Sequence, residues 1–212
     1  MVDVGVIHGR FQILHLKHME YLLAAKMRCK KLYVGISNPD DSYIKESEND
    51  KKRSKKTANP LTYYERMEMI QAALLDFGVK REEFDIIPFP INRPEYILQY
   101  APKDATFFMS ICDKWGEEKK KILEDLGVKV EVLWNRPEEE KGTTATEVRS
   151  KIVCNLPWSH LVPRTTYEYV VTHGLDERIK RLTEEEMLEE KEQQEKDRRE
   201  NTLQEKEEEA NV

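Results

Sequence analysis

Two histidines, His15 and His18, stand three positions apart directly after the segment Gly9-Arg10-Phe11-Gln12. An apolar run over residues 2–7 precedes them, and apolar residues at helical spacing follow over residues 18–29. This order predicts a turn from a buried strand into a helix, with both imidazoles at the helix N-terminus. Free N–H groups and a positive dipole end suit a phosphate there, and the Arg10 guanidinium would add donors. The alternative is that the two histidines are ordinary helix caps.

The pattern Gly-Arg-Phe-Gln-x-x-His-x-x-His resembles the signature of the His-x-Gly-His nucleotidyltransferases, and it is most similar to the archaeal-type nicotinamide-nucleotide adenylyltransferases. The resemblance implies that a nucleoside triphosphate is joined to a substrate phosphate and that pyrophosphate leaves. It makes His15 and His18 catalytic donors to the phosphates. It implies nucleotide contacts for Gly9, Arg10, Phe11, Gln12 and Lys17. Lys17 stands where the family usually has Gly, so it either adds a phosphate contact or crowds the base, and Ile13 replaces the usual Pro.

A second segment, residues 143–151, resembles the superfamily's other signature, Ser/Thr-x-Thr-x-x-Arg at a helix N-terminus. The resemblance implies that Thr144 and Thr146 offer hydroxyl and backbone N–H groups to the β- and γ-phosphates. Arg149, one turn into the helix, would reach the same anion and is the third predicted catalytic residue. Taken alone, the segment would be interpreted as a plain helix cap by Thr144 or Thr146.

Residues 59–70 resemble the family block Asn-Pro-Phe-Thr-x-x-Glu-Arg that follows the second strand. Thr62 and Glu65 have the spacing of a capping box, with Thr62 as N-cap of a helix. The resemblance implies that Arg66 positions substrate phosphates. The alternative is a surface ion pair between Arg66 and Glu65 or Glu68.

The acceptor residues are predicted from two further segments. The archaeal-type enzymes hold an Asn and a Trp against the nicotinamide ring, and Asn92 falls in register with that Asn. No Trp is present there, so Tyr96 or Trp115 is the candidate stacking surface, unless these rings are core residues. Asp113 is an N-cap candidate at the next helix start. In the acceptor pocket its carboxylate would instead favour a substrate that carries a hydroxyl or amine group.

Five short runs rich in Val, Ile, Tyr and Phe alternate with helical patterns, over residues 2–7, 31–37, 84–90, 106–112 and 129–134. This alternation predicts an α/β fold: a Rossmann-like, doubly wound, parallel five-stranded sheet with helices on both faces. Ligands of such sheets bind outside the carboxyl ends of the strands at the topological switch point. The His15–His18 turn follows the first strand, at the place where this rule puts a phosphate.

The charge of the chain is unevenly distributed. Residues 184–212 hold 13 acidic and five basic side chains, so this segment carries −8 of a chain whose net charge is −6, and the remainder is slightly basic. We therefore expect a nucleotidyltransferase domain over residues 1–182 and an acidic tail, helical or disordered, over residues 183–212. Residues 40–58 form a basic insertion, interpreted as a solvated loop. The alternative is a flap whose Lys51, Lys52, Arg53, Lys55 or Lys56 reaches the triphosphate.

Three cysteines without paired spacing, Cys29, Cys112 and Cys154, fit a reducing cytoplasm and no zinc site. No apolar run is long enough to span a bilayer, and no signal peptide precedes the first strand. The expected localisation is cytoplasmic, with neither a membrane nor a nucleic acid as partner. The sequence leaves open whether the chain assembles into a homo-oligomer.

The predicted reaction transfers a nucleoside monophosphate group, with Mg²⁺ bridging the phosphates through water and no protein residue named as a metal ligand. The resemblance implies ATP and nicotinamide mononucleotide as substrates, giving NAD. The second reading is a cytidylyltransferase or adenylyltransferase for another phosphorylated small molecule, with CTP or ATP as the nucleoside triphosphate. A third, of another class, is a non-catalytic nucleotide-binding module in which Lys17 occupies the base site.

Overall fold

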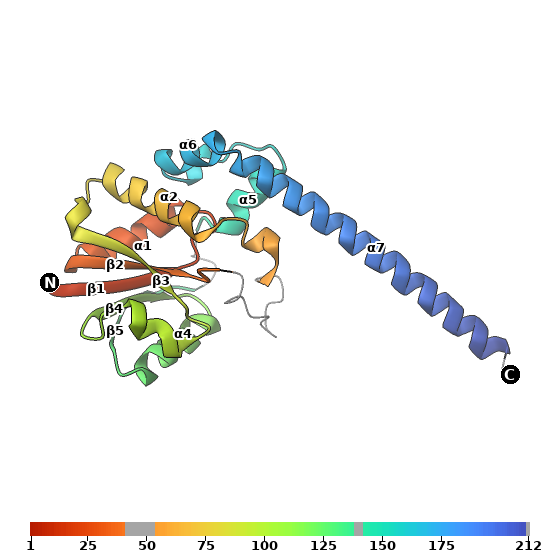
Figure 1. The fold of residues 1–212 in the computed structure, drawn as a ribbon, viewed down its shortest axis with the longest axis horizontal. Helices are drawn as coiled ribbons and strands as arrows, with labels where there is room; N and C mark the ends of the chain where they lie inside the picture. The colour runs from red at the N-terminus through yellow and green to blue at the C-terminus, as the bar shows by residue number, and fades with distance from the viewer. Residues whose placement is uncertain (41–53, 138–141, 211–212) are drawn as a thin grey trace.

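A computed structural model of the chain describes residues 1–40, 54–137 and 142–210 (Figure 1). Its centre is a five-stranded sheet in the order β3-β2-β1-β4-β5, and every pair of neighbouring strands is parallel. The strands are β1 (Val2–Gly9), β2 (Cys29–Ser37), β3 (Phe84–Phe89), β4 (Thr106–Ile111) and β5 (Lys129–Asn135). The prediction of a doubly wound parallel sheet is confirmed.

Strand β1 lies in the middle of the sheet, so both of its edges are paired with a neighbouring strand. It pairs with β2 from Val2 opposite Cys29 to Gly9 opposite Ile36, and on its other edge with β4. The chain moves outward through β2 and β3 and then returns to the other side of β1. The carboxyl ends of β1 and β4 therefore flank the switch point, where parallel sheets bind their ligands.

Helices cover the two faces of the sheet unequally (Figure 1). A larger apolar core lies on one face of the sheet, and a smaller core lies on the other. The larger core receives side chains from α1 (Leu16–Lys26), α2 (Tyr63–Asp76), α5 (Ala145–Val153), α6 (Arg164–Thr172) and the start of α7 (Leu175–Ala210). The smaller core is closed by α3 (Ile97–Tyr100) and α4 (Lys114–Asp125).

The ends of helices α2 and α1 test two local predictions. The capping box of Thr62 and Glu65 is confirmed, since the Thr62 hydroxyl accepts from the Glu65 N–H and the Glu65 carboxylate accepts from the Thr62 N–H. The predicted helix over residues 18–29 was wrong at both ends. Helix α1 begins at Leu16, and Cys29 already belongs to β2 because it pairs with Val2 of the central strand.

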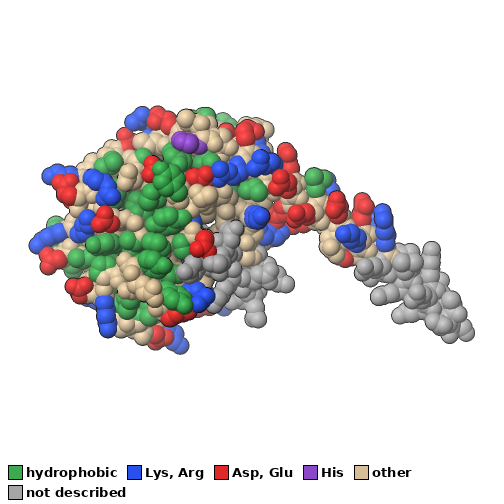
Figure 2. Space-filling model, in the orientation of Figure 1, with side chains coloured by type: hydrophobic (Ala, Val, Ile, Leu, Met, Phe, Trp, Pro, Cys, Tyr) green, Lys and Arg blue, Asp and Glu red, His purple; other side chains and the backbone are tan. Residues whose placement is uncertain are grey.

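Helix α7 runs continuously through the predicted boundary between residues 182 and 183. Its first turns pack on the larger core, and the rest projects away (Figure 1), with acidic and basic side chains on the part that Figure 2 describes. Lys55, from the basic insertion, pairs with Glu186 and with Glu190, the latter at 2.6 Å. The acidic segment is thus joined to the insertion by ion pairs, and the division into a domain and a tail stays a prediction.

Lys51, Lys52 and Arg53, which belong to the solvated loop or to the alternative flap, lie outside the described residues. In the described part of the chain, no helix is long and apolar enough to cross a membrane.

Candidate active site

The two histidines of the first motif bind each other's backbone. His15 is the N-cap of α1, and its Nδ1 accepts from the His18 N–H at 3.3 Å, while His18 Nδ1 accepts from the His15 N–H at 3.4 Å. The rings stack with centroids 3.6 Å apart. The capping interpretation is thus correct for the Nδ1 atoms. A neutral ring that accepts at Nδ1 carries its proton at Nε2, so each ring also has a donor group, and the His18 ring has a backbone hydrogen bond with Ile13.

Both rings are neutral at physiological pH. His15 is only 5% exposed, and its burial lowers its pKa to about 4. Burial also holds the pKa of His18 well below its usual value, and the neighbouring His15 and the Arg10 guanidinium lower it further. The pair therefore offers hydrogen bonds to an anion without adding formal charge.

The turn between β1 and α1 is shaped by Gly9, Phe11 and Gln12. Phe11 has a positive φ of 53° and its buried ring meets His18 edge-on, with centroids 5.0 Å apart. A Cβ on Gly9 would come within 2.8 Å of the Phe11 ring, so only glycine leaves room for it. The Gln12 side chain forms two 2.9 Å hydrogen bonds with the backbone of Leu61. These contacts fix the turn, and direct contact of the three residues with a nucleotide stays a prediction.

Arg149 brings the second motif onto the first. Its buried guanidinium donates to the Gln12 carbonyl and to the Thr146 hydroxyl, the latter at 3.3 Å. Burial, followed by the positive charge of Arg10, lowers its pKa to about 10. Two guanidinium groups close enough to repel each other favour an anion between them. Thr144 caps α5 and accepts from the Glu147 N–H at 3.1 Å, as the plain-cap interpretation required.

Lys17 lies across the gap between the two motifs. Its ammonium pairs with Glu20 at 2.8 Å, and Glu20 also pairs with Arg136 at 3.0 Å. Its stem covers Gly142, because a Cβ on that glycine would lie 2.7 Å from Lys17 Cε. The space that a glycine at position 17 would leave open at the start of α1 is therefore partly filled.

Arg66 is 2% exposed, so the alternative of a surface ion pair is wrong. Its guanidinium donates to backbone carbonyls of the β1–α1 turn, the end of β2 and the start of α2. The acceptors are Thr62 at 3.1 Å, Arg10 at 3.1 Å, Ser37 at 2.7 Å and Asn38 at 2.8 Å. Arg66 thereby ties the ends of β1 and β2 to α2, and its predicted contact with substrate phosphates stays a prediction.

The predicted acceptor residues lie on two segments, after β3 and after β4. Asn92 donates to the Asn38 side chain at 3.2 Å, which connects it to the carbonyl that Arg66 holds. The Arg93 guanidinium covers the Tyr96 ring, and Lys119 lies over Trp115 at 5.9 Å. The Asp113 carboxylate accepts from the Gly116 N–H at 2.7 Å and caps α4, and its role in an acceptor pocket stays a prediction.

Sequence reasoning missed two residues at the same edge. Asn38, with φ of 50°, directly follows β2 and contacts both Arg66 and Asn92. His8 is buried at the end of β1, one residue before Gly9, and stacks on Phe89. The signal that could have found His8 was a polar side chain that interrupts an apolar strand directly before the motif.

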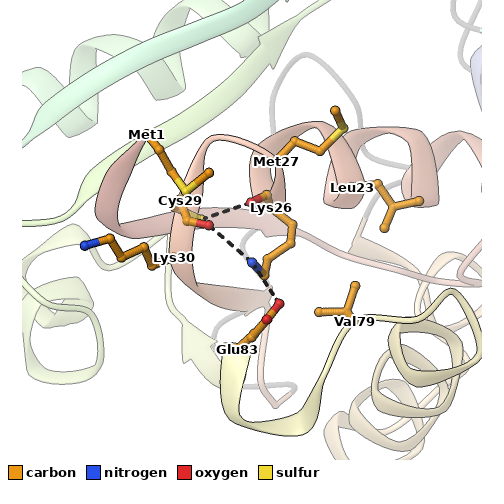
Figure 3. Close-up of a pocket in the computed structure, with 8 residues that line it drawn as sticks. All are labelled: Met1, Leu23, Lys26, Met27, Cys29, Lys30, Val79 and Glu83. Atoms are coloured by element: carbon orange, nitrogen blue, oxygen red, sulfur yellow. Dashed lines mark hydrogen bonds and ion pairs between the residues drawn. The ribbon is translucent and has the colours of Figure 1, made fainter.

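The site is distinct from a shallow pocket of about 570 Å³ at the amino ends of β1 and β2 (Figure 3). That pocket is lined by Met1, Leu23, Met27 and Cys29 among others, with Lys26 paired to Glu83 at 3.0 Å. It lies at the end of the sheet away from the switch point, so it does not belong to the candidate active site. Among the described residues, no group of three His, Cys, Asp or Glu side chains is placed to hold a metal ion.

The chain is similar in sequence to several known proteins. The cytidylyltransferase-like family model matches residues 6–151. The chain is 45% identical to a phosphonoformate cytidylyltransferase of Streptomyces viridochromogenes, over 85% of this chain and 97% of that one. It is 28% identical to a nicotinamide-nucleotide adenylyltransferase of Saccharolobus solfataricus, over 84% and 95% of the two chains.

Among solved structures, the chain resembles a bifunctional NMN adenylyltransferase/ADP ribose pyrophosphatase from Francisella tularensis, with a TM-score of 0.61. The identity is 16%, and the match covers 84% of this chain and 53% of that one, so this likeness concerns the fold alone.

Proposed function

Because the chain belongs to the cytidylyltransferase-like family and is a nucleotidyltransferase, we propose that it transfers CMP from CTP to a small phosphonate that carries a carboxylate, with release of pyrophosphate. Family membership sets aside the non-catalytic module. The observation that carries the choice of substrates is the 45% identity to a phosphonoformate cytidylyltransferase over nearly its whole length.

The position of Lys17 supports CTP as the nucleotide. Its stem lies over Gly142 and occupies room beside the start of α1. A cytosine ring is smaller than an adenine, so it loses less when this space is filled. The nucleotidyltransferases that the first motif resembles usually have Gly at this position and leave the space open.

The reaction follows from the charges at the turn. An anionic oxygen of the acceptor attacks the α-phosphorus of the nucleotide, a new P–O bond forms, and the bond to the bridging β-oxygen breaks. A phosphonate or phosphate monoester is already ionised near neutral pH, so no general base is required. The Nε2–H groups of His15 and His18 would donate to the phosphate oxygens where negative charge develops. Neither histidine has to gain or lose a proton.

Arg10 and Arg149 supply the fixed positive charge. Their mutual repulsion, seen in the lowered pKa of Arg149, is relieved when the β- and γ-phosphates lie between them. The N-terminus of α5, at Thr144, adds backbone N–H groups. Arg, His and Thr side chains are donors that fit phosphate oxygens and do not fit a cation. Mg²⁺ would therefore be carried by the triphosphate, where it neutralises charge.

A second candidate is the synthesis of NAD from ATP and nicotinamide mononucleotide. The observation in its favour is the similarity, at 26–28% identity, to several archaeal nicotinamide-nucleotide adenylyltransferases. Asn92, at the place of the ring-binding Asn of those enzymes, is held by Asn38 at the edge of the site.

Pyrophosphate release separates the two candidates. Purified protein with Mg²⁺ is given CTP or ATP, each with phosphonoformate, nicotinamide mononucleotide or a panel of phosphate monoesters. We expect release with CTP and phosphonoformate, and none from the His18→Ala variant. Release with ATP and nicotinamide mononucleotide alone would replace the proposal by NAD synthesis. Release with CTP and a different acceptor would keep the cytidylyl transfer and overturn the acceptor.

A further inference from the structure

His8 occupies the carboxyl end of β1 on the sheet face opposite to His15 and His18. The side chains of Val6 and Phe89, on the His8 face, belong to the smaller core, whereas Ile7 and Phe11 belong to the larger one. His8 is 8% exposed, and Lys119 of α4 is close enough for its charge to act on the ring. It takes no part in the donor cluster of His15, His18 and Arg149.

Residues of three neighbouring strands, β1, β2 and β3, form the surroundings of the His8 ring. Its ring lies flat on that of Phe89, with centroids 4.5 Å apart and planes 6° from parallel. Phe89 belongs to β3 and His8 to β1, and between them on β2 the partner of His8 is Gly35. A Cβ on Gly35 would lie 2.6 Å from the Phe89 ring. The missing side chain lets Phe89 cross β2 and reach the histidine.

The His8 ring nitrogen Nε2 is buried and has no hydrogen-bond partner among the residues that the structure describes. A buried polar group without a partner destabilises a fold, so a purely structural role would be served better by a second phenylalanine. The residues of the core below, Val6 and Phe107, are apolar and offer no side-chain acceptor. A partner for Nε2 therefore has to arrive from the carboxyl edge, where ligands of this sheet bind.

The segments that flank His8 are those expected to hold the acceptor. Phe89 ends β3, three residues before Asn92. Lys119 of α4 lies one turn beyond Trp115 and near enough for its positive charge to act on His8. Burial and this charge lower the pKa of His8 to about 3, so the ring is neutral and can donate from Nε2.

From this placement we infer that His8 is an acceptor-binding residue: its Nε2–H donates to an anionic oxygen of the acceptor other than the attacking one, and Lys119 supplies positive charge beside that oxygen. The site then selects acceptors with a second anionic group next to the reacting phosphonate. This assignment rests on the proposed function for the identity of the acceptor, a carboxylated phosphonate, and not for the position of the contact.

The test compares full-length wild type with His8→Phe, which keeps a ring against Phe89 and removes the donor, and with His8→Gln, whose amide restores one. Phosphonoformate is the acceptor, and methylphosphonate is the analogue without the carboxylate. A hydrogen bond to a charged group predicts that His8→Phe raises the phosphonoformate KM by about 10- to 100-fold. The KM for CTP stays within about twofold, the methylphosphonate KM does not change, and His8→Gln recovers part of the loss.

Several results would overturn the inference. These are an equal rise in KM for both acceptors, a rise in the CTP KM instead, or a lower Tm for His8→Phe with unchanged acceptor KM, since the last is the result of a structural role. We expect the Tm of His8→Phe to equal or exceed that of wild type. If His8→Phe fails to fold, His8→Leu, which also removes the donor, is compared with wild type on the same two acceptors.

Failure of the proposed function gives a different result. If wild type uses ATP and nicotinamide mononucleotide, the cytidylyl proposal falls, and His8 is judged by whether His8→Phe changes the KM of that acceptor alone. If no turnover occurs, calorimetric binding of phosphonoformate and methylphosphonate to wild type and His8→Phe replaces KM. Equal binding to both proteins would then overturn the role of His8.

Discussion

The candidate site has two halves at the carboxyl edge of the sheet, one on each face. The halves differ in how their side chains are hydrogen-bonded to the protein. On the α1 side, the Nδ1 atoms of His15 and His18 and the Arg149 guanidinium are bound to neighbouring protein groups. On the α4 side, His8 has a buried nitrogen without a partner in the described part of the chain. In the proposed reaction, the α1 side would bind the triphosphate, a group common to all nucleoside triphosphates, so its side chains can be held in place by the protein. On the α4 side, the acceptor would supply the partner that the His8 nitrogen lacks.

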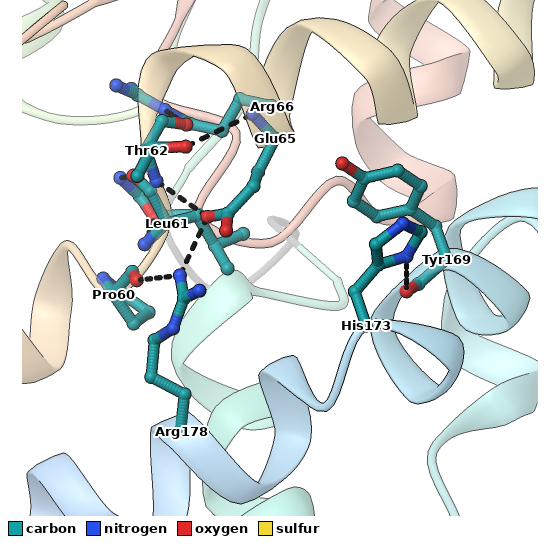
Figure 4. A network of polar contacts seen from close by, with 9 residues as sticks. Pro60, Leu61, Thr62, Glu65, Arg66, Tyr169, His173 and Arg178 are labelled. Atoms are coloured by element: carbon teal, nitrogen blue, oxygen red, sulfur yellow. Dashed lines mark hydrogen bonds and ion pairs between the residues drawn. The ribbon is translucent and has the colours of Figure 1, made fainter.

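The largest expected effect comes from Arg66, which connects the halves through the Arg10 and Asn38 carbonyls. Arg66→Met leaves buried carbonyls without donors and should lower the free energy of unfolding by roughly 3–5 kcal/mol, measured by urea denaturation. Arg178→Met is the matched control. It removes a partly exposed pair with Glu65 (Figure 4) and should cost about 1 kcal/mol or less. Equal losses in the two variants would show that Arg66 does not tie the halves together.

His18→Ala should affect only the half of the site that is proposed to bind the nucleotide. Loss of one donor to the phosphates should lower kcat by about 10²–10³ while the acceptor KM changes little. Steady-state pyrophosphate release measures both constants. His160→Ala, at an exposed position away from the site, serves as the control and should retain full activity. Wild-type turnover by His18→Ala would remove His18 from the reaction.

Lowering the pH should destabilise the protein, because the buried imidazoles of His15 and His8 are neutral in the folded state. The folded-state pKa values of His15 and His8 lie at about 4 and 3, below the value near 6.5 of an unfolded chain. The unfolded state therefore binds protons first, and stability that is present above about pH 6.5 is lost as pH falls toward 4. For each of the two histidines, the free energy of unfolding should fall by about 2 kcal/mol between pH 7 and pH 5. Denaturation of His8→Phe at the two pH values should show a loss smaller by that amount, and an unchanged loss would mean that His8 takes up its proton in the folded state.

Lys17→Gly should produce the smallest effect of these variants, a change in the preference between ATP and CTP. Opening the space beside Gly142 should raise kcat/KM for ATP relative to CTP by about tenfold, the scale of a small steric change in a binding pocket. Glu20→Gln is the control, because it loosens the Lys17 ammonium and leaves the stem in place. A similar shift in both variants would assign the preference to charge and not to space.

The sequence predicted the fold better than it predicted the contacts of the site. Apolar runs located all five strands, because strands buried on both faces are apolar throughout. The first motif was recognised because its residues are neighbours in the chain. The partners of Arg66 are backbone carbonyls up to 56 positions away, and a carbonyl has no sequence signature. His8 carried a signal, its polarity within an apolar strand, but its surroundings could not be predicted because Phe89 and Lys119 approach it only after β3 and α4 are in place.

Helix α7 has a consequence for how the molecule moves in water. Its 36 residues extend roughly 54 Å at 1.5 Å per residue, and most of that length projects beyond the globular part (Figure 1). Frictional drag depends on shape as well as on mass. On a sizing column the protein should elute ahead of globular standards with the same number of residues, and its tumbling should be anisotropic. Light scattering measures the mass of a particle independently of its shape. It therefore gives the number of chains in the particle, since each chain has a mass of 25.1 kDa.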